Sequence, residues 1–397
     1  MNKGKKKELE LYIHIPFCVR KCSYCDFLSA PADEGTKEAY LQALCREITE
    51  KSKNYQDYVV TTIFIGGGTP TAVPAVWIKR VMEKVQQHYC LQREAEITME
   101  MNPGTVDLAA LQVYRQAGIN RLSIGLQSAE EKELKVLGRI HSYEQFLETY
   151  GWARETGFEN INVDIMSGLP EQSMESYQRT LERVTGLLPP PEHISAYSLI
   201  VEEGTPFYEA YKAHSLLLPD EDVERGMYEL TGNFLHEQGY ERYEISNYAK
   251  RGRECRHNLG YWERADYLGF GIGAASLIEN VRFSNGRNLQ KYLQNPCQVV
   301  ENYQTLTMAE QMEETMFLGL RKTAGVSLEN FEKNFGVPLL QVYGDVAEKH
   351  LREGLLRLVT DSQGRQSLVL TLKGMEVSNY VMADFLEPSL FSEQNAL

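Results

Sequence analysis

The first half of the chain alternates short apolar runs with longer stretches in which apolar residues recur every three or four positions. The apolar runs fall at residues 9–15, 61–67, 95–101, 120–126, 161–167 and 193–200, and the helical stretches at residues 37–51, 75–89, 108–117, 143–156 and 174–187. Strands that alternate with helices form a parallel sheet covered by helices. Six such units over about two hundred residues fit either an open doubly wound sheet or an incomplete barrel.

Polar residues at the ends of these runs favour the barrel. The runs end, in order, in a cysteine-rich loop, Gly66-Gly67-Gly68-Thr69-Pro70, Glu100 with Asn102-Pro103, Gln127-Ser128, Asp164 within the fifth run, and Tyr197-Ser198. A (β/α) barrel collects functional groups at the carboxyl ends of all its strands, whereas an open sheet binds its ligand at one switch point. The sequence therefore predicts an α/β fold, a partial (β/α)6 barrel, with one cavity lined by all six strand ends.

The second half of the chain predicts two further parts. A barrel over residues 1–200 is expected to be followed by a helical extension over residues 201–302. The last part, residues 303–397, has helical stretches at 308–321, 328–335 and 340–353 and a two-stranded hairpin near 355–371, all of which precede residues 373–384. Helices combined with such a wing resemble a small winged-helix module. Its recognition segment, residues 340–353, has mixed charge, so we expect a cap or partner-binding module rather than a DNA reader.

Composition narrows the protein class. The chain has 397 residues, a formal net charge of −14 and seven cysteines. The acidic balance argues against broad nucleic-acid binding, which needs a basic face. An odd number of cysteines and the lack of a signal peptide argue against a disulfide framework. No apolar run approaches membrane-spanning length, so we expect a cytoplasmic protein.

Three cysteines carry the most specific signal. Cys18, Cys22 and Cys25 follow the first apolar run with C-x3-C-x2-C spacing. Three thiolates on one loop can hold three irons of a [4Fe–4S] cluster and leave the fourth iron open to another ligand. A zinc site usually needs a second close pair of ligands, and no such pair follows. The remaining cysteines are scattered and are expected to pack as small apolar residues.

This spacing resembles that of the radical S-adenosylmethionine (SAM) superfamily. The resemblance implies that SAM chelates the open iron and that the cluster cleaves it to a 5′-deoxyadenosyl radical. Further motifs, in order, narrow the resemblance over about residues 9–300 to the branch that contains oxygen-independent coproporphyrinogen III oxidase: YIHIPFC from Tyr12, GGGTPT, EMNP from Glu100, RLSIGLQS from Arg121, LGRIHS from Leu137 and NVDIMSGLP from Asn162.

Position by position, the resemblance implies a set of SAM contacts. These are Tyr12, Tyr24, Gly67, Gly68, Thr69, Glu100, Gln127, Arg139 and Asp164. Arg139 would meet the SAM carboxylate through a charge-assisted contact. From the residues alone the alternatives stay open: a glycine-rich turn, a surface arginine, and buried carboxylates that pair with a barrel lysine or arginine instead of a ligand.

Two departures from the oxidases bear on function. Phe27 occupies the position of the oxidases' fourth cysteine, and only about ten residues precede the first strand, where the oxidases carry a long segment over the active site. Both favour the haem-chaperone members of this branch. We therefore expect a protein that binds haem and transfers it to an acceptor haemoprotein, membrane-associated acceptors included. The alternative is a radical SAM enzyme that acts on a tetrapyrrole; the oligomeric state stays open.

A further motif concerns haem itself. His257-Asn258-x-x-Tyr261-Trp262 resembles a haem-binding signature of that branch. An imidazole can serve as an axial iron ligand, and aromatic side chains suit the wall of a porphyrin site. Cys255 is a competing thiolate ligand, and a core histidine packed among aromatic residues is the alternative interpretation.

Overall fold

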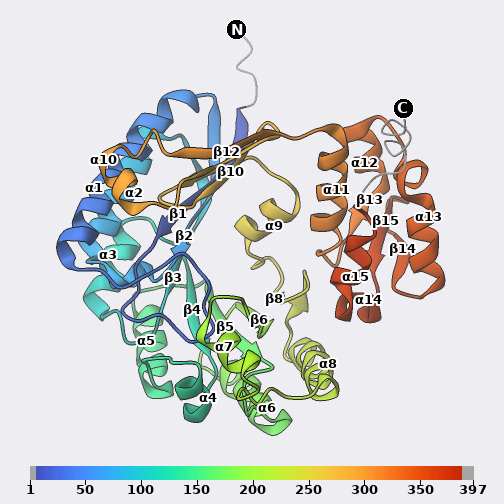
Figure 1. The fold of residues 1–397 in the computed structure, drawn as a ribbon, viewed down its shortest axis with the longest axis horizontal. Coiled ribbons are helices and arrows are strands. Elements are labelled where there is room, and N and C mark those ends of the chain that lie inside the picture. The colour runs from blue at the N-terminus through green and yellow to red at the C-terminus, as the bar shows by residue number, and fades with distance from the viewer. Residues whose placement is uncertain (1–5, 387–397) are drawn as a thin grey trace.

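The computed structural model describes residues 6–386, and its barrel is built on a sheet of twelve strands. Six parallel strands form its centre in chain order, as Figure 1 shows. They are β1 (Lys7–Ile15), β2 (Tyr58–Gly67), β3 (Leu91–Met101), β4 (Arg121–Gln127), β5 (Ile161–Ser167) and β6 (His193–Ser198). A doubly wound sheet would reverse its strand order at a switch point, and this sheet does not. The expected partial (β/α)6 barrel is confirmed.

Helices cover the outer face of these strands (Figure 1). They are α1 (Glu34–Lys51), α2 (Ala75–His88), α3 (Leu108–Gln116), α4 (Glu131–Val136), α5 (Tyr143–Glu155) and α6 (Met174–Thr185). Side-chain N-caps begin several of them where expected; Ser142, for example, forms a capping box with Gln145. The sequence did not predict α4, whose six residues are too few to show a helical period.

The extension contains strands as well as the expected helices. The helices are α7 (Pro206–Lys212), α8 (Glu221–Glu237), α9 (Arg256–Trp262) and α10 (Leu289–Gln294), and the strands are β7 (Glu241–Arg242), β8 (Asn247–Ala249), β9 (Tyr267–Phe270), β10 (Ala275–Ile278), β11 (Val281–Asn285) and β12 (Val300–Thr305). Strand β8 pairs with β6, and β9 pairs in parallel with β1. The extension therefore continues the sheet at both edges of the six-stranded arc, while α9 lies inside its open side (Figure 1).

The C-terminal module has its own core. Its elements are α11 (Met308–Gly319), β13 (Val326–Ser327), α12 (Leu328–Phe335), α13 (Leu339–Arg352), β14 (Leu356–Thr360), β15 (Gln366–Leu370), α14 (Leu372–Glu376) and α15 (Ser378–Ala383). The expected hairpin is present as β14 and β15, and β13, which lies between α11 and α12 in the chain, adds a third strand in the order β13-β15-β14. Together with α11, α12 and α13 this is the expected winged-helix-like arrangement. After the hairpin, α14 and α15 are separated at Val377, which leaves helical geometry (φ −114°, ψ 31°).

Within residues 6–386, no helix is both long enough and apolar enough to cross a membrane. The main apolar core lies between the barrel strands and their outer helices, and a second core fills the C-terminal module. Because the six central strands are parallel, their carboxyl ends meet at one rim, and that rim carries the candidate site.

Candidate cofactor site at the strand ends

The cysteine loop is anchored at both ends. It leaves β1 and returns beside it, where Phe17 bridges to Ala30 and the Cys18 N–H donates to the Ala30 carbonyl (3.2 Å). A turn brings the Cys25 N–H to the Cys22 carbonyl (3.3 Å). All three thiols are free and partly buried. The loop is therefore held at the barrel rim with its three cysteines close together.

One cavity of about 120 Å³ unites these cysteines with the predicted SAM-binding residues. Its lining includes Cys18, Cys22, Cys25, Tyr24, Gly68, Thr69, Glu100, Gln127, Arg139 and Asp164. These residues come from five different strand ends and from the loops that follow them. We call this space the cysteine cavity. The expected cavity is thus present at five of the six strand ends, whereas Tyr197 and Ser198 at the end of β6 line a different cavity. The individual contacts to SAM stay predictions.

The glycine turn after β2 is required by the protein's own packing. Gly67 has a φ of 111°, and a Cβ there would lie 2.3 Å from His14 Nδ1. At Gly68 a Cβ would lie 2.6 Å from the Phe17 carbonyl oxygen. The glycines therefore allow β1 and the cysteine loop to approach closely. Gly68 lines the cysteine cavity, whereas Gly67 lies beneath it.

Two carboxylates lie on the inner wall of this cavity. Glu100 accepts a hydrogen bond from the Gly67 N–H (3.0 Å), and burial together with the nearby charge of Asp164 raises the pKa of Glu100 to about 7. Burial also raises the pKa of Asp164, although Asn162 and Ser123 donate hydrogen bonds to it (2.7 and 3.2 Å). Neither carboxylate has an ion pair with a lysine or arginine among the described residues. A cationic or hydroxyl-bearing ligand would therefore be well matched here.

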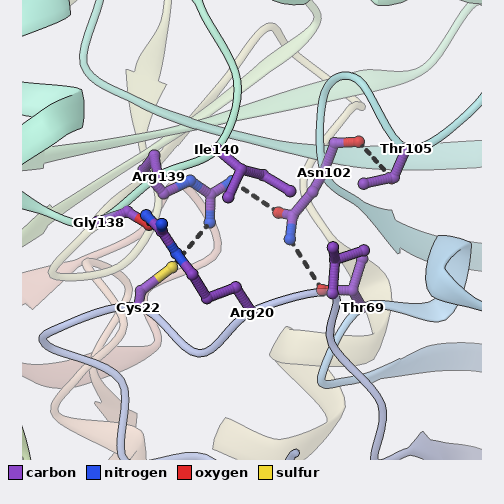
Figure 2. Close-up of a pocket in the computed structure, with 9 residues that line it drawn as sticks. Arg20, Cys22, Thr69, Asn102, Thr105, Gly138, Arg139 and Ile140 are labelled. Atoms are coloured by element: carbon purple, nitrogen blue, oxygen red, sulfur yellow. Dashed lines mark hydrogen bonds between the residues drawn. The ribbon is translucent and has the colours of Figure 1, made fainter. Parts of the chain in front are cut away.

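Arg139 is one of three cations that line the cavity, with Arg20 and Lys21. Figure 2 shows its guanidinium between Asn102 Oδ1, at 2.7 Å, and Cys22 Sγ, at 3.7 Å. It also donates to the Gly125 carbonyl (2.7 Å), while its buried Nε has no partner in the described part of the chain. An orphaned donor beside the cysteines is what an incoming carboxylate would satisfy. Arg139 is thus a fixed cavity residue rather than a surface arginine.

Sequence reasoning missed Asn102 as a site residue. Its side-chain amide lies between Arg139 and Thr69 and donates a hydrogen bond to Thr69 Oγ1 (2.8 Å; Figure 2). The Thr69 hydroxyl in turn donates to Cys18 Sγ (3.5 Å). The signal was its place two residues after Glu100, at the end of a strand. Asn102 orients the groups that surround the cysteines.

Tyr12 lies outside the cavity lining. Its hydroxyl is hydrogen-bonded to His14 Nδ1 (3.0 Å), and its ring stacks against Phe64 at a centroid distance of 6.4 Å. Burial raises the pKa of this phenol. Tyr12 therefore supports the base of the glycine turn in this arrangement, and its predicted contact with SAM stays a prediction.

His257 is also remote from the cysteine cavity. Its ring is 1% exposed and stacks on Phe64 (5.2 Å), with Nδ1 hydrogen-bonded to Thr62 Oγ1 (2.7 Å) and Nε2 to the Tyr261 hydroxyl (3.1 Å). Burial lowers the pKa of His257 to about 3. Both ring nitrogens have partners, so the arrangement is that of a core histidine, and an axial role would require α9 to rearrange.

Cys255, the competing haem ligand, is buried as well. Its thiol lies 3.6 Å from Glu96 Oε1, and burial raises its pKa to about 12. A thiol with so high a pKa is a poor thiolate ligand. Neither candidate for the haem iron is therefore presented to an open cavity.

The donor chemistry at the rim fits an iron–sulfur cluster. Three soft thiol ligands face one cavity, and burial and the neighbouring thiols raise the pKa of Cys25. Across residues 6–386, no three His, Cys, Asp or Glu side chains are grouped to share a single metal ion.

Comparisons with known proteins agree with this geometry. Residues 12–184 match the Radical SAM superfamily, and residues 306–377 match the HemN C-terminal domain. A protein named Heme chaperone HemW from Bacillus subtilis (strain 168) is 37% identical over 384 residues, which cover 94% of this chain and 98% of that protein. The protein of the same name from Escherichia coli (strain K12) is 41% identical over 287 residues, covering 72% of this chain and 74% of that one.

A solved structure shows the same fold. Coproporphyrinogen III oxidase (HemN) from Escherichia coli superposes with a TM-score of 0.80 at 24% identity, covering 97% of this chain and 91% of that one. The barrel, the three-cysteine loop and the matched domains define a radical SAM protein. Within that superfamily, the chain belongs to the family of the HemW proteins. Membership of the superfamily implies a [4Fe–4S] cluster and SAM.

Proposed function

We propose that this protein is a haem chaperone: it binds haem and transfers it to an acceptor haemoprotein, on a radical SAM scaffold. The observation that carries the proposal is the similarity to HemW proteins along 94% of the chain, which includes the cysteine loop, the extension and the C-terminal module. Phe27 occupies the position where the oxidases have a fourth cysteine, and its side chain is 60% exposed. The absence of that fourth cysteine also supports the proposal.

The residues of the cysteine cavity have separate tasks in this proposal. Cys18, Cys22 and Cys25 hold the cluster, which, when bound with SAM, supplies one-electron chemistry at the sulfonium. Arg139 binds the SAM carboxylate through its unpartnered Nε. Asp164 and Glu100 accept hydrogen bonds from the hydroxyl and amino groups of the ligand. Tyr24 shields the cavity, with its ring 6.5 Å from that of Phe207.

The partners follow from the same proposal. The cargo is haem, and the recipient is a haemoprotein, membrane-associated haemoproteins included. The transfer takes place in the cytoplasm. Nothing in this arrangement demands a preformed axial ligand. A chaperone must release its cargo, so weak iron ligation combined with contacts to the porphyrin serves it better than two strong ligands would.

A radical SAM enzyme acting on a tetrapyrrole is the second candidate. The intact polar lining of the cysteine cavity favours it, because Arg139, Glu100 and Asp164 are the kinds of groups that a SAM-cleaving site needs. The two candidates differ in their product: the chaperone returns haem unchanged, whereas an oxidase converts coproporphyrinogen III.

The test is an anaerobic reconstitution with iron, sulfide and SAM. Haem is titrated into one sample and followed by its Soret band, and coproporphyrinogen III is added to another. We expect saturable haem binding and no conversion of coproporphyrinogen III. Conversion to protoporphyrinogen IX without haem binding would replace the chaperone by the enzyme.

A further inference from the structure

A second, larger cavity lies between the barrel and the C-terminal module. It has a volume of about 1000 Å³, at the upper end of the range for ligand sites. Its walls come from β6, α8, α9, the segment after α11 and the region of α14. Figure 1 shows α9 between the barrel and that module. We call this space the module cavity.

The module cavity has flat aromatic walls. Tyr261 and Trp262 of α9 line it together with Tyr228 of α8. The Arg321 guanidinium lies over the Trp262 ring at 4.5 Å. The helix α9 thus divides its residues between two environments: His257 faces the barrel interior, and Tyr261 and Trp262 reach the cavity.

Unsatisfied polar atoms gather around the same cavity. Four buried side-chain atoms of its lining have no hydrogen-bond partner among the described residues: Glu244 Oε2, Asn247 Oδ1, Trp262 Nε1 and Arg321 Nε. Native proteins leave few such groups unpaired, and each is costly unless a ligand or water satisfies it. The cavity is therefore built for a ligand with polar substituents as well as a flat apolar body.

The lining carries charges of both signs: the cations are Arg225, Arg321 and Lys373, and the carboxylates are Glu221, Glu224, Glu244 and Glu376. Arg225 is paired with Asp222 and Glu376. Lys373 of α14 is exposed at the cavity and forms no ion pair within residues 6–386. Arg321 lines the same cavity, and its Nη2 lies 3.7 Å from Glu244 Oε2. Arg321 and Lys373 both belong to the C-terminal part of the chain, on the far side of the cavity from the barrel.

We propose that the module cavity is the haem site, with the porphyrin against Tyr261 and Trp262 and its two carboxylates paired with Arg321 and Lys373. This inference rests on the proposed chaperone function and adds the place and the mode of recognition. The C-terminal module becomes one wall of the cargo site. Release of haem then requires the contacts of Arg321 and Lys373 to the carboxylates to break, with no strong iron ligand to displace.

The test uses the full-length reconstituted protein and two probes, haem and haem dimethyl ester, which lacks free carboxylates. Lys373→Glu and Arg321→Gln are compared with Lys333→Glu, a matched charge reversal on an exposed lysine of α12 outside the cavity. Wild type and Lys333→Glu are expected to bind haem about tenfold more tightly than the ester, and both cavity variants are expected to lose that preference.

Each outcome bears on one claim. If the wild type binds haem and all variants keep the same preference for haem over its dimethyl ester, the module cavity is not the haem site, and the proposed chaperone function still holds. Absence of haem binding by the wild type would overturn both. Cluster absorbance and far-ultraviolet circular dichroism report folding, and the exposed Lys373→Glu keeps the test valid should Arg321→Gln fail to fold.

Discussion

The cysteine cavity and the module cavity differ in how completely the protein has prepared them. At the barrel rim, Arg139, Asn102 and Thr69 already form a connected set of hydrogen bonds around the cysteines. In the described structure, four buried side-chain atoms of the module cavity have no partner, Trp262 Nε1 and Arg321 Nε among them, against one such atom in the cysteine cavity, Arg139 Nε. A resident cofactor suits the first arrangement and a transient cargo the second. One chain can therefore hold a cofactor firmly where the polar groups of the site are already hydrogen-bonded to one another, and a cargo loosely where they are not.

The largest expected effect is loss of the cluster. Cys18→Ser, Cys22→Ser or Cys25→Ser should each abolish the visible absorbance and most of the bound iron and sulfide after reconstitution, because each thiolate holds one iron. Cys90→Ser, at an exposed cysteine away from the loop, is the control and should retain the cluster. Near-normal iron in all three loop variants would disprove the assignment. Haem binding that persists in the three loop variants would show that haem does not bind in the cysteine cavity.

Arg139→Ala should weaken SAM binding by more than tenfold, which corresponds to about 1.5–3 kcal/mol for a hydrogen bond to a charged group. Equilibrium dialysis with labelled SAM measures this, and Arg139→Lys, which keeps the charge without the fork of donors, should recover part of the affinity. Asp164→Ala is expected to act in the same direction. Unchanged SAM affinity in both alanine variants, with iron content intact, would place SAM elsewhere.

Replacing His257 tests whether this residue of α9 is a core residue of the barrel or a ligand of the haem iron. His257→Ala removes a buried ring that has two hydrogen bonds and stacks on Phe64, so it should lower the free energy of unfolding by about 2 kcal/mol. Denaturant titration measures the loss, and His236→Ala, at an exposed residue of α8, should change little. Haem bound to the variant should keep its Soret position. A shifted Soret band would show that His257 binds the iron.

The last expected effect concerns Glu100 and appears only as a dependence of stability on pH. Its pKa rises from 4.5 in the unfolded chain to about 7, so the folded protein holds this proton more tightly. Stability is therefore highest at low pH for this group and falls as pH rises between the two values. Without cofactors, Glu100→Gln should gain about 2–3 kcal/mol over wild type on going from about pH 5 to about pH 8. Urea unfolding at both pH values measures the difference; an equal change in both proteins would contradict the pKa shift.

The sequence predicted the cysteine cavity well because its signals are local. Cys18, Cys22 and Cys25 lie on one short loop, and the strand ends that carry Glu100 and Asp164 must meet once the strands are parallel. The six barrel strands were likewise predicted from apolar runs. Strands such as β7 and β8, of two and three residues, are too short to show any period.

The module cavity could not be predicted in this way. Arg321 and Lys373 are far in sequence from Tyr261 and Trp262, and only the packing of the C-terminal module brings them to one space. Nor does the spacing of His257 and Tyr261 on α9 reveal that the imidazole packs against Phe64 inside the barrel. Tertiary packing determines which way that face of α9 points, and a short sequence motif carries no information about this packing.

Transfer of haem is the most direct measurement of the central claim. The reconstituted protein, loaded with one haem and kept anaerobic, is mixed with an apo-haemoprotein, and the Soret bands of donor and acceptor are followed over time. We expect the acceptor spectrum to grow as the donor spectrum decays, with the haem chemically unchanged. Haem that stays on the protein, or reaches the acceptor no faster than free haem does, would contradict it.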